Sequence, residues 1–154
     1  EIFDYAIENG YTIAWGSDVS EKGFTRNGIA VAPDVEATQK AGSDEERWIG
    51  KSKDEKDAIL YNLNAPGKEL TITQEMRQEG YDNKTTTDDH GMHIYGIAKD
   101  QNGTKYYMVK NSWGPSGKYK GIWYVSAPFV QYKTMNIVVN KNAIPAAIRE
   151  KLGL

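Results

Sequence analysis

The sequence predicts an α+β domain in which helices flank an antiparallel, barrel-like sheet. Two long runs in the middle of the chain are rich in aromatic and β-branched residues, and Asn102-Gly103 between them is the dipeptide most typical of a hairpin. Patterns typical of capped, amphipathic helices fall before and after this centre. With 154 residues, the chain is long enough to form a single domain, 1–154, around its own core.

The first half of the chain is expected to alternate short helices and strands. Apolar residues at helical spacing predict a first helix that ends near Gly10, and no residue suits the cap at its start. Short strands are predicted at 11–15 and 28–32. Capping-box patterns at 52–55 and 71–74 each predict the start of a further helix, the second running to about residue 80.

The end of the chain is expected to return to the sheet and finish in a helix. Strands are predicted at 122–125 and 135–139, with one helical turn at 127–132 between them. Asn142 is the expected cap of the last helix, with Pro145 in its first turn.

The central hairpin is expected to bring a histidine to an asparagine, and its register decides which histidine. A two-residue turn places Ile94 opposite Asn111 and leaves His90 roughly 13 Å away along the strand. A turn two residues longer places Met92 opposite Asn111 and brings His90 within roughly 7 Å. A turn one residue longer pairs His93 with Asn111 and turns His90 to the other face. The spacing favours a His–Asn pair and leaves open which histidine forms it.

Two motifs in this hairpin resemble those of a known family. Residues 89–92 (Asp-His-Gly-Met) and 110–114 (Lys-Asn-Ser-Trp-Gly) resemble the histidine and asparagine motifs of papain-like cysteine peptidases, especially the bleomycin hydrolase and aminopeptidase C branch. The resemblance covers most of residues 70–154, with a weaker match at 15–19. It implies the right-hand domain of the papain-like fold, which carries the histidine and asparagine and faces a helical domain carrying the cysteine.

The resemblance also implies roles for individual residues. His90 is the expected acid/base, and Asn111 accepts a hydrogen bond that holds the imidazole ring in place. Trp113 resembles the indole that shields this hydrogen bond from water. The carboxylate of Leu154 is expected to hold the α-ammonium group of a peptide substrate, because the last residues lie in the cleft in the aminopeptidase branch. A frayed tail is an equally good interpretation of the same residues. No cofactor or metal is implied.

The chain departs from the family in having no cysteine. In relatives the nucleophile and the oxyanion-hole glutamine both lie upstream, and Ser112 is a poor substitute because it lies inside the asparagine motif. We therefore expect the chain to be the C-terminal part of a longer peptidase, inactive without a cysteine-bearing domain as its partner. Relatives form hexamers, which implies a possible homo-oligomer. The sequence does not indicate a compartment, although many relatives are cytoplasmic.

The sequence argues against a metal site, a nucleic-acid surface and a membrane span. Asp88, Asp89, His90 and His93 could be interpreted as zinc ligands, but a spacing of three places the two histidines on opposite faces of a strand. Asp89 is more simply a residue that caps the loop. The net charge of −2 argues against a nucleic-acid surface, and no apolar run approaches membrane-spanning length.

Binding without catalysis is the main alternative. Ten tyrosines and four tryptophans would suit a module that binds peptides or sugars, although Trp15, Trp48 and Trp123 are expected to pack in the core. A pseudopeptidase that keeps the fold but lacks the nucleophile is the closer rival. A glutamine followed by a cysteine at the head of a helix, in sequence upstream of Glu1, would favour an active peptidase. Another residue in place of the cysteine would favour binding without catalysis.

Overall fold

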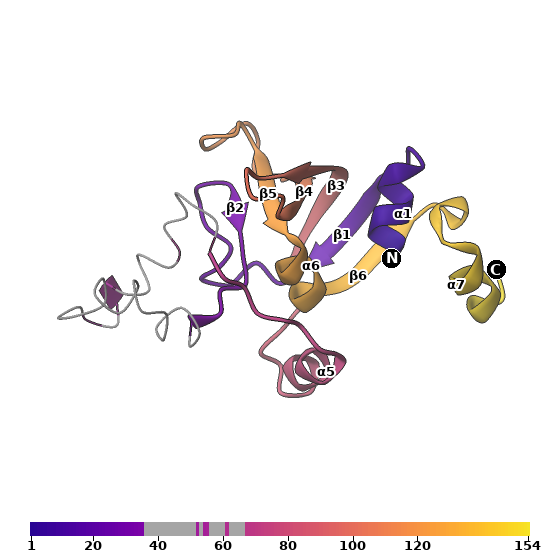
Figure 1. The fold of residues 1–154 in the computed structure, drawn as a ribbon, viewed down its shortest axis with the longest axis horizontal. Coiled ribbons are helices and arrows are strands. Elements are labelled where there is room, and N and C mark those ends of the chain that lie inside the picture. The colour runs from indigo at the N-terminus through magenta and orange to yellow at the C-terminus, as the bar shows by residue number, and fades with distance from the viewer. Residues whose placement is uncertain (36–51, 53, 56–60, 62–66) are drawn as a thin grey trace.

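A computed structural model describes residues 1–35, 52, 54–55, 61 and 67–154 of the chain. Its six strands form one sheet in the order β2-β5-β4-β3-β1-β6 (Figure 1). The strands are β1 (Ile13–Ser17), β2 (Ile29–Ala30), β3 (His90–Lys99), β4 (Lys105–Lys110), β5 (Ile122–Ser126) and β6 (Thr134–Val139). The helices are α1 (Ile2–Glu8), α5 (Gln74–Asp82), α6 (Ala127–Lys133) and α7 (Ala146–Leu152), with a 3-10 turn, η1, at Lys141–Ala143.

The α+β class expected from the sequence is confirmed. Strands β5, β4, β3, β1 and β6 pair antiparallel with their neighbours, and the two-residue strand β2 pairs parallel with β5. Among the described strands, β2 and β6 are the edges, so the sheet is open rather than closed on itself. One face of this sheet packs against the hydrophobic core, and the other face is exposed.

The core lies against the face of the sheet that α1 and α6 cover (Figure 1). Buried residues alternate along the strands, as expected where every second side chain points to the same face. The fully buried members with the largest side chains include Trp15, Phe129, Ile13, Ile94 and Val109. The alternation leaves Ala14, His93 and Lys110 exposed on the opposite face.

The central hairpin does not use the two-residue turn that Asn102-Gly103 suggests. Asp100 Oδ1 accepts hydrogen bonds from the backbone N–H of Asn102 (2.8 Å) and of Thr104 (2.9 Å). Lys99 pairs with Lys105 at the base of the turn, which therefore spans 100–104. Gly103 has a φ of 81°, a conformation that glycine adopts readily.

Two helix caps differ from the sequence prediction. Helix α5 is capped by Thr73 and not, as predicted, by the residue at position 71. The hydroxyl of Thr73 accepts from the N–H of Met76 at 3.3 Å. The chain stays extended through Leu70, whose N–H donates to the carbonyl of Ala32, and the helix therefore starts later.

The cap predicted at Asn142 is also wrong. Asn140 caps the short η1 turn by accepting from the N–H of Asn142 at 2.9 Å. Helix α7 then follows Pro145 without a side-chain cap.

The capping box at 52–55 is present. Ser52 N–H donates to Glu55 Oε2 at 2.8 Å, and Glu55 N–H donates back to Ser52 Oγ at 3.3 Å. Most of the helix predicted to follow it, and Trp48, lie outside the described residues. In the part of the chain that is described, no helix is long and apolar enough to cross a membrane.

Helix α1 is anchored to β4 by an ion pair and an aromatic contact. Lys105 Nζ lies 2.7 Å from Asp4 Oδ1, and the Tyr107 hydroxyl donates to the same oxygen at 2.7 Å. The ring of Phe3 packs edge-on against Tyr107, with 5.6 Å between centroids. Burial raises the pKa of Asp4, but the hydrogen bonds from Lys105 and Tyr107 and the charge of Lys105 outweigh it, so the pKa is lowered overall.

We expect Asp4→Asn to lower the free energy of unfolding by about 1 kcal/mol at neutral pH, because the pair is partly exposed. The folded-state pKa lies below the ordinary 3.8, so the stabilisation is present above that value and is lost as the pH falls through the folded pKa. Denaturant unfolding at several pH values measures this. Glu150→Gln on exposed α7 is the control, and a difference from wild type that persists at low pH would contradict the assignment.

Candidate active site

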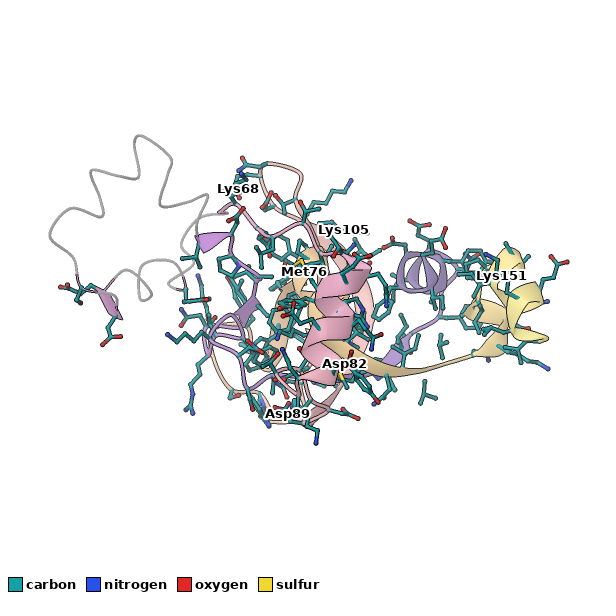
Figure 2. The ribbon with its side chains drawn as sticks, turned by 90° about the horizontal axis from the view of Figure 1, so that it is seen from below. Lys68, Met76, Asp82, Asp89, Lys105 and Lys151 are labelled. Atoms are coloured by element: carbon teal, nitrogen blue, oxygen red, sulfur yellow. The ribbon has the colours of Figure 1, made fainter. Side chains whose placement is uncertain are left out.

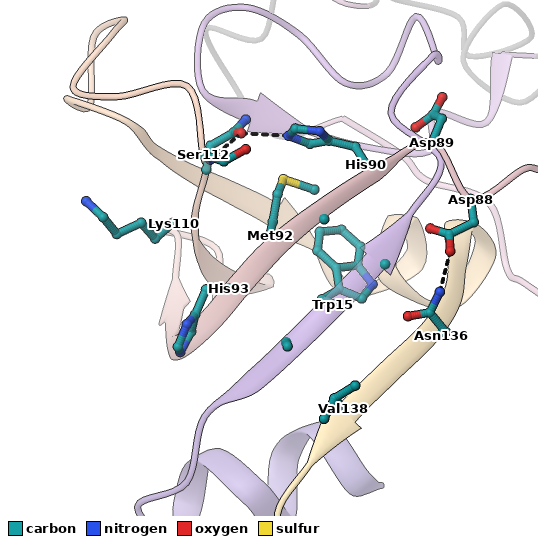
Figure 3. Close-up of a pocket in the computed structure, with 14 residues that line it drawn as sticks. Trp15, Asp88, Asp89, His90, Met92, His93, Lys110, Ser112, Asn136 and Val138 are labelled. Atoms are coloured by element: carbon teal, nitrogen blue, oxygen red, sulfur yellow. Dashed lines mark hydrogen bonds between the residues drawn. The ribbon is translucent and has the colours of Figure 1, made fainter.

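The structure pairs His90, and not His93, with Asn111. His90 is the first residue of β3, and Asn111 directly follows β4. His90 Nε2 lies 2.8 Å from Asn111 Oδ1 (Figure 3). His93 lies opposite Lys110 on the exposed face of the sheet. The expected His–Asn pair is therefore formed, and the choice of histidine is settled in favour of His90.

A β-bulge makes this choice. From the turn, β3 and β4 pair in a register that continues to Gly96 opposite Met108, and this register would bring His93 opposite Asn111. Next to Gly96 the pairing shifts by one residue, and Ile94 lies opposite Val109. A bulge places an extra residue on one strand. Tyr95 is that residue, and it restores the register in which His90 reaches Asn111.

The hydrogen bonds at Asn111 fix which imidazole nitrogen carries the proton. Asn111 Oδ1 also accepts from the backbone N–H of Ser112 at 2.7 Å, so this end of the amide must be the oxygen. His90 Nε2 must then donate, which leaves His90 Nδ1 as the nitrogen able to accept a proton. Asn111 is buried, and its own N–H donates to the carbonyl of Gly121 at 3.0 Å.

Asn111 Nδ2 has an unusual environment. It is a buried nitrogen with no hydrogen-bond partner among the described residues. A buried donor without an acceptor costs stability, roughly 1–3 kcal/mol. The oxygen of the same amide accepts two hydrogen bonds, from His90 and from the N–H of Ser112, which offset this cost.

Trp113 packs beside the pair, as the resemblance implied. Its ring centroid lies 4.7 Å from that of His90, with 36° between the planes. Its edge-on contacts with Phe24 (6.1 Å) and Trp123 (5.7 Å) hold the indole in place, although half of its surface is exposed. The indole therefore lies directly against the imidazole of the pair.

Two carboxylates fasten the start of β3 to the end of β1. Asp89 accepts from the N–H groups of Val19 (2.9 Å) and Ser20 (3.2 Å). In return, the buried Asp18 accepts from the N–H of Thr87 at 2.8 Å. Burial raises the pKa of Asp89, but the hydrogen bonds from Ser20 and Val19 outweigh it and lower the pKa overall. Asp89 thus caps a loop, as expected, and this loop leads directly into His90.

A buried lysine supports the same two loops and was not foreseen from the sequence. Lys133 Nζ lies 2.5 Å from Glu21 Oε1 and 3.1 Å from Thr86 Oγ1. Its carbonyl accepts from Ser17 Oγ at 2.9 Å. These partners are far apart in sequence, so no local pattern indicated the contact.

A cavity of about 740 Å³ opens beside His90 on the exposed face of the sheet (Figure 3). Its lining includes residues without a large side chain, namely Ala14, Gly16 and Gly91, and polar residues on either side. Within the described residues, no group of three or more His, Asp or Glu side chains is placed to hold a metal ion.

The structure does not bring Leu154 to this cavity. Leu154 is exposed and is not among the residues that line it. Figures 1 and 2 show α7 and the C-terminus at one end of the molecule, with Lys151 of α7 well away from Asp89. Trp15 and Trp123 are buried in the core, as predicted.

Asn111→Ala should release the imidazole of His90. The ring then loses the acceptor that holds the proton on Nε2, so neutral His90 should become a mixture of both tautomers. Nitrogen chemical shifts of the two ring atoms measure this by NMR, and His93 in the same spectrum is the internal control. A His90 spectrum unchanged by the substitution would show that Asn111 does not set the tautomer.

Known proteins resemble this chain in family and in fold. A model of the Peptidase C1-like family matches residues 34–153. The crystal structure of PepW from Lactobacillus rhamnosis HN001 is similar in fold, with a TM-score of 0.58 and 22% identity over 97% of this chain. The match spans 28% of the PepW chain. Among curated proteins, no significant match is found. Because the family model covers most of its length, the chain belongs to the Peptidase C1-like family.

Proposed function

We propose that this chain is the His–Asn half of a papain-like cysteine aminopeptidase, which hydrolyses peptide bonds at peptide N-termini. The observation that carries the proposal is the 2.8 Å contact between His90 Nε2 and Asn111 Oδ1, covered by Trp113, in a member of the Peptidase C1-like family. An imidazole oriented in this way can exchange a proton through Nδ1 with a nucleophile and a leaving group.

The chemistry requires a thiol that this chain does not contain. Nδ1 of His90 takes the proton of that thiol, and the thiolate adds to the peptide carbonyl carbon. The C–N bond breaks as Nδ1 returns the proton to the leaving amine. Water then attacks the thioester, its proton passes to Nδ1, and the acid and the thiol are released. Asn111 keeps the ring oriented throughout because Nε2 remains its donor.

We propose that the thiol belongs to another domain of a longer protein, in which residues 1–154 form one domain. The match to only 28% of the PepW chain supports this, because the remainder of that chain has no counterpart here. His90 is the first residue of β3 and lines the cavity at the end of the strand, and such a domain would present its cysteine to Nδ1 there. The sequence upstream of Glu1 tests this proposal. A cysteine there, at the head of a helix, would support the peptidase, whereas another residue at that position would favour a pseudopeptidase.

His90→Ala in the full-length protein is expected to lower peptide turnover by about 10²–10⁴-fold or more, because the acid/base is lost. Turnover of unblocked dipeptide or tripeptide substrates measures this, and circular dichroism verifies that the fold is kept. His93→Ala is the matched control, with a much smaller loss expected. Comparable losses in the two variants, or retained activity of His90→Ala, would refute the assignment of His90.

The role of Leu154 in binding the substrate's ammonium group remains a prediction that rests on the resemblance. If its carboxylate limits cleavage to the first residues, then adding residues after Leu154 should shift the full-length enzyme from aminopeptidase towards endopeptidase cleavage. The ratio of rates on free and N-acetylated peptides measures the shift. An unchanged ratio would remove Leu154 from the site.

A further inference from the structure

An aminopeptidase must recognise a primary ammonium group, and the cavity beside His90 already contains a carboxylate suited to this. Asp88 lines the same cavity as His90 and Asn111. Asp89 lines it too, but both of its oxygens accept backbone hydrogen bonds, from Val19 and Ser20. Asp88 has exposed side-chain surface, and in the described part of the chain it forms no ion pair.

The carboxylate of Asp88 is held in place by a residue of β6, which lies on the far side of β1 from β3. Asn136 on β6 donates a hydrogen bond from Nδ2 to Asp88 Oδ2 at 2.5 Å (Figure 3). Asn136 lies over β1 at Gly16, where an added Cβ would come within 2.6 Å of the Asn136 amide. Glycine at this position therefore allows the amide to reach across to Asp88. One oxygen of Asp88 is oriented by Asn136, and Oδ1 has no hydrogen-bond partner among the residues that the structure describes.

The charges around the cavity favour a cation near Asp88 in particular. Lys110 lines the cavity from β4, on the side away from Asp88 and Asn136 (Figure 3). Strands β3 and β1 separate β4 from β6 in the sheet. An ammonium group is repelled at the Lys110 side and attracted at the Asp88 side.

We propose that Asp88 binds the primary ammonium group of the substrate, with the peptide bond to be cleaved placed towards His90. The inference rests on the proposed function, since it names what that site selects. It differs from the expected role of Leu154, because Asp88 lies in the cavity without any movement of the tail. The ammonium group is the substrate's N-terminus or a lysine side chain, and both present the same chemistry to a carboxylate.

The test compares wild type, Asp88→Asn and the control Asp54→Asn, an exposed aspartate outside the cavity, in the full-length protein. Asp88→Asn keeps the size of the side chain and its bond from Asn136 but removes the charge. We expect kcat/KM for peptides with a free ammonium group to fall roughly 10- to 100-fold, mainly through KM, with N-acetylated peptides that carry norleucine in place of lysine unaffected. Acetylated peptides with lysine or norleucine near the cleaved bond distinguish the two sources. A loss of kcat/KM on the lysine peptide but not on the norleucine peptide identifies a lysine side chain as the source of the ammonium group.

Equal losses on free-amine peptides and on acetylated norleucine peptides would mean that Asp88 is structural and would overturn the inference, as would no loss at all. Binding of the same peptides, measured by calorimetry, needs no turnover. If the full-length protein proves inactive, the proposed function fails, and binding still decides the role of Asp88. Weaker binding of the free-amine peptide to Asp88→Asn supports the inference, whereas equal affinities, including no binding by either protein, overturn it.

Discussion

The pairing of β3 with β4 is the constraint on which the site depends. In a sheet, a shift of one residue sends every side chain to the opposite face. The five-residue turn alone would bring His93 to Asn111, and the bulge at Tyr95 returns the strand to the register that selects His90. The imidazole, its orienting amide and the cavity all follow from this one-residue shift, because each lies beyond the bulge from the turn.

The loops at the start of β3 also help to hold His90 in position. Asp18 and Asp89 each accept backbone hydrogen bonds from the other's loop, and the buried Lys133 contacts both loops. Hydrogen bonds to charged groups are stronger than those between neutral groups. His90 is therefore held from two directions, by its strand partner on one side and by these fastened loops on the other. Its position does not depend on the imidazole contact alone.

The sequence predicted the class of fold and a His–Asn pair, and the family resemblance, not the spacing, indicated His90. It did not predict the details that position the pair. The Asn102-Gly103 signal located the hairpin correctly, yet the number of turn residues and the bulge at Tyr95 have no reliable local signature. The cap of α5 was misplaced because pairing near Leu70 with a distant segment overrides the local pattern. The Asp18 and Lys133 contacts join residues far apart in sequence, which periodicity cannot reveal.

The bulge also determines where this hairpin can change in length. Ile94 pairs with Val109 and Gly96 pairs with Met108, and these two partners are consecutive residues of β4. A chain that lost Tyr95 would thus continue as a regular ladder, with both halves of the hairpin still paired as they are now. At most strand positions, deletion of one residue shifts the register and turns all the side chains on one side of the deletion to the opposite face of the sheet. Homologues of different hairpin length could therefore share an identical arrangement of histidine and asparagine.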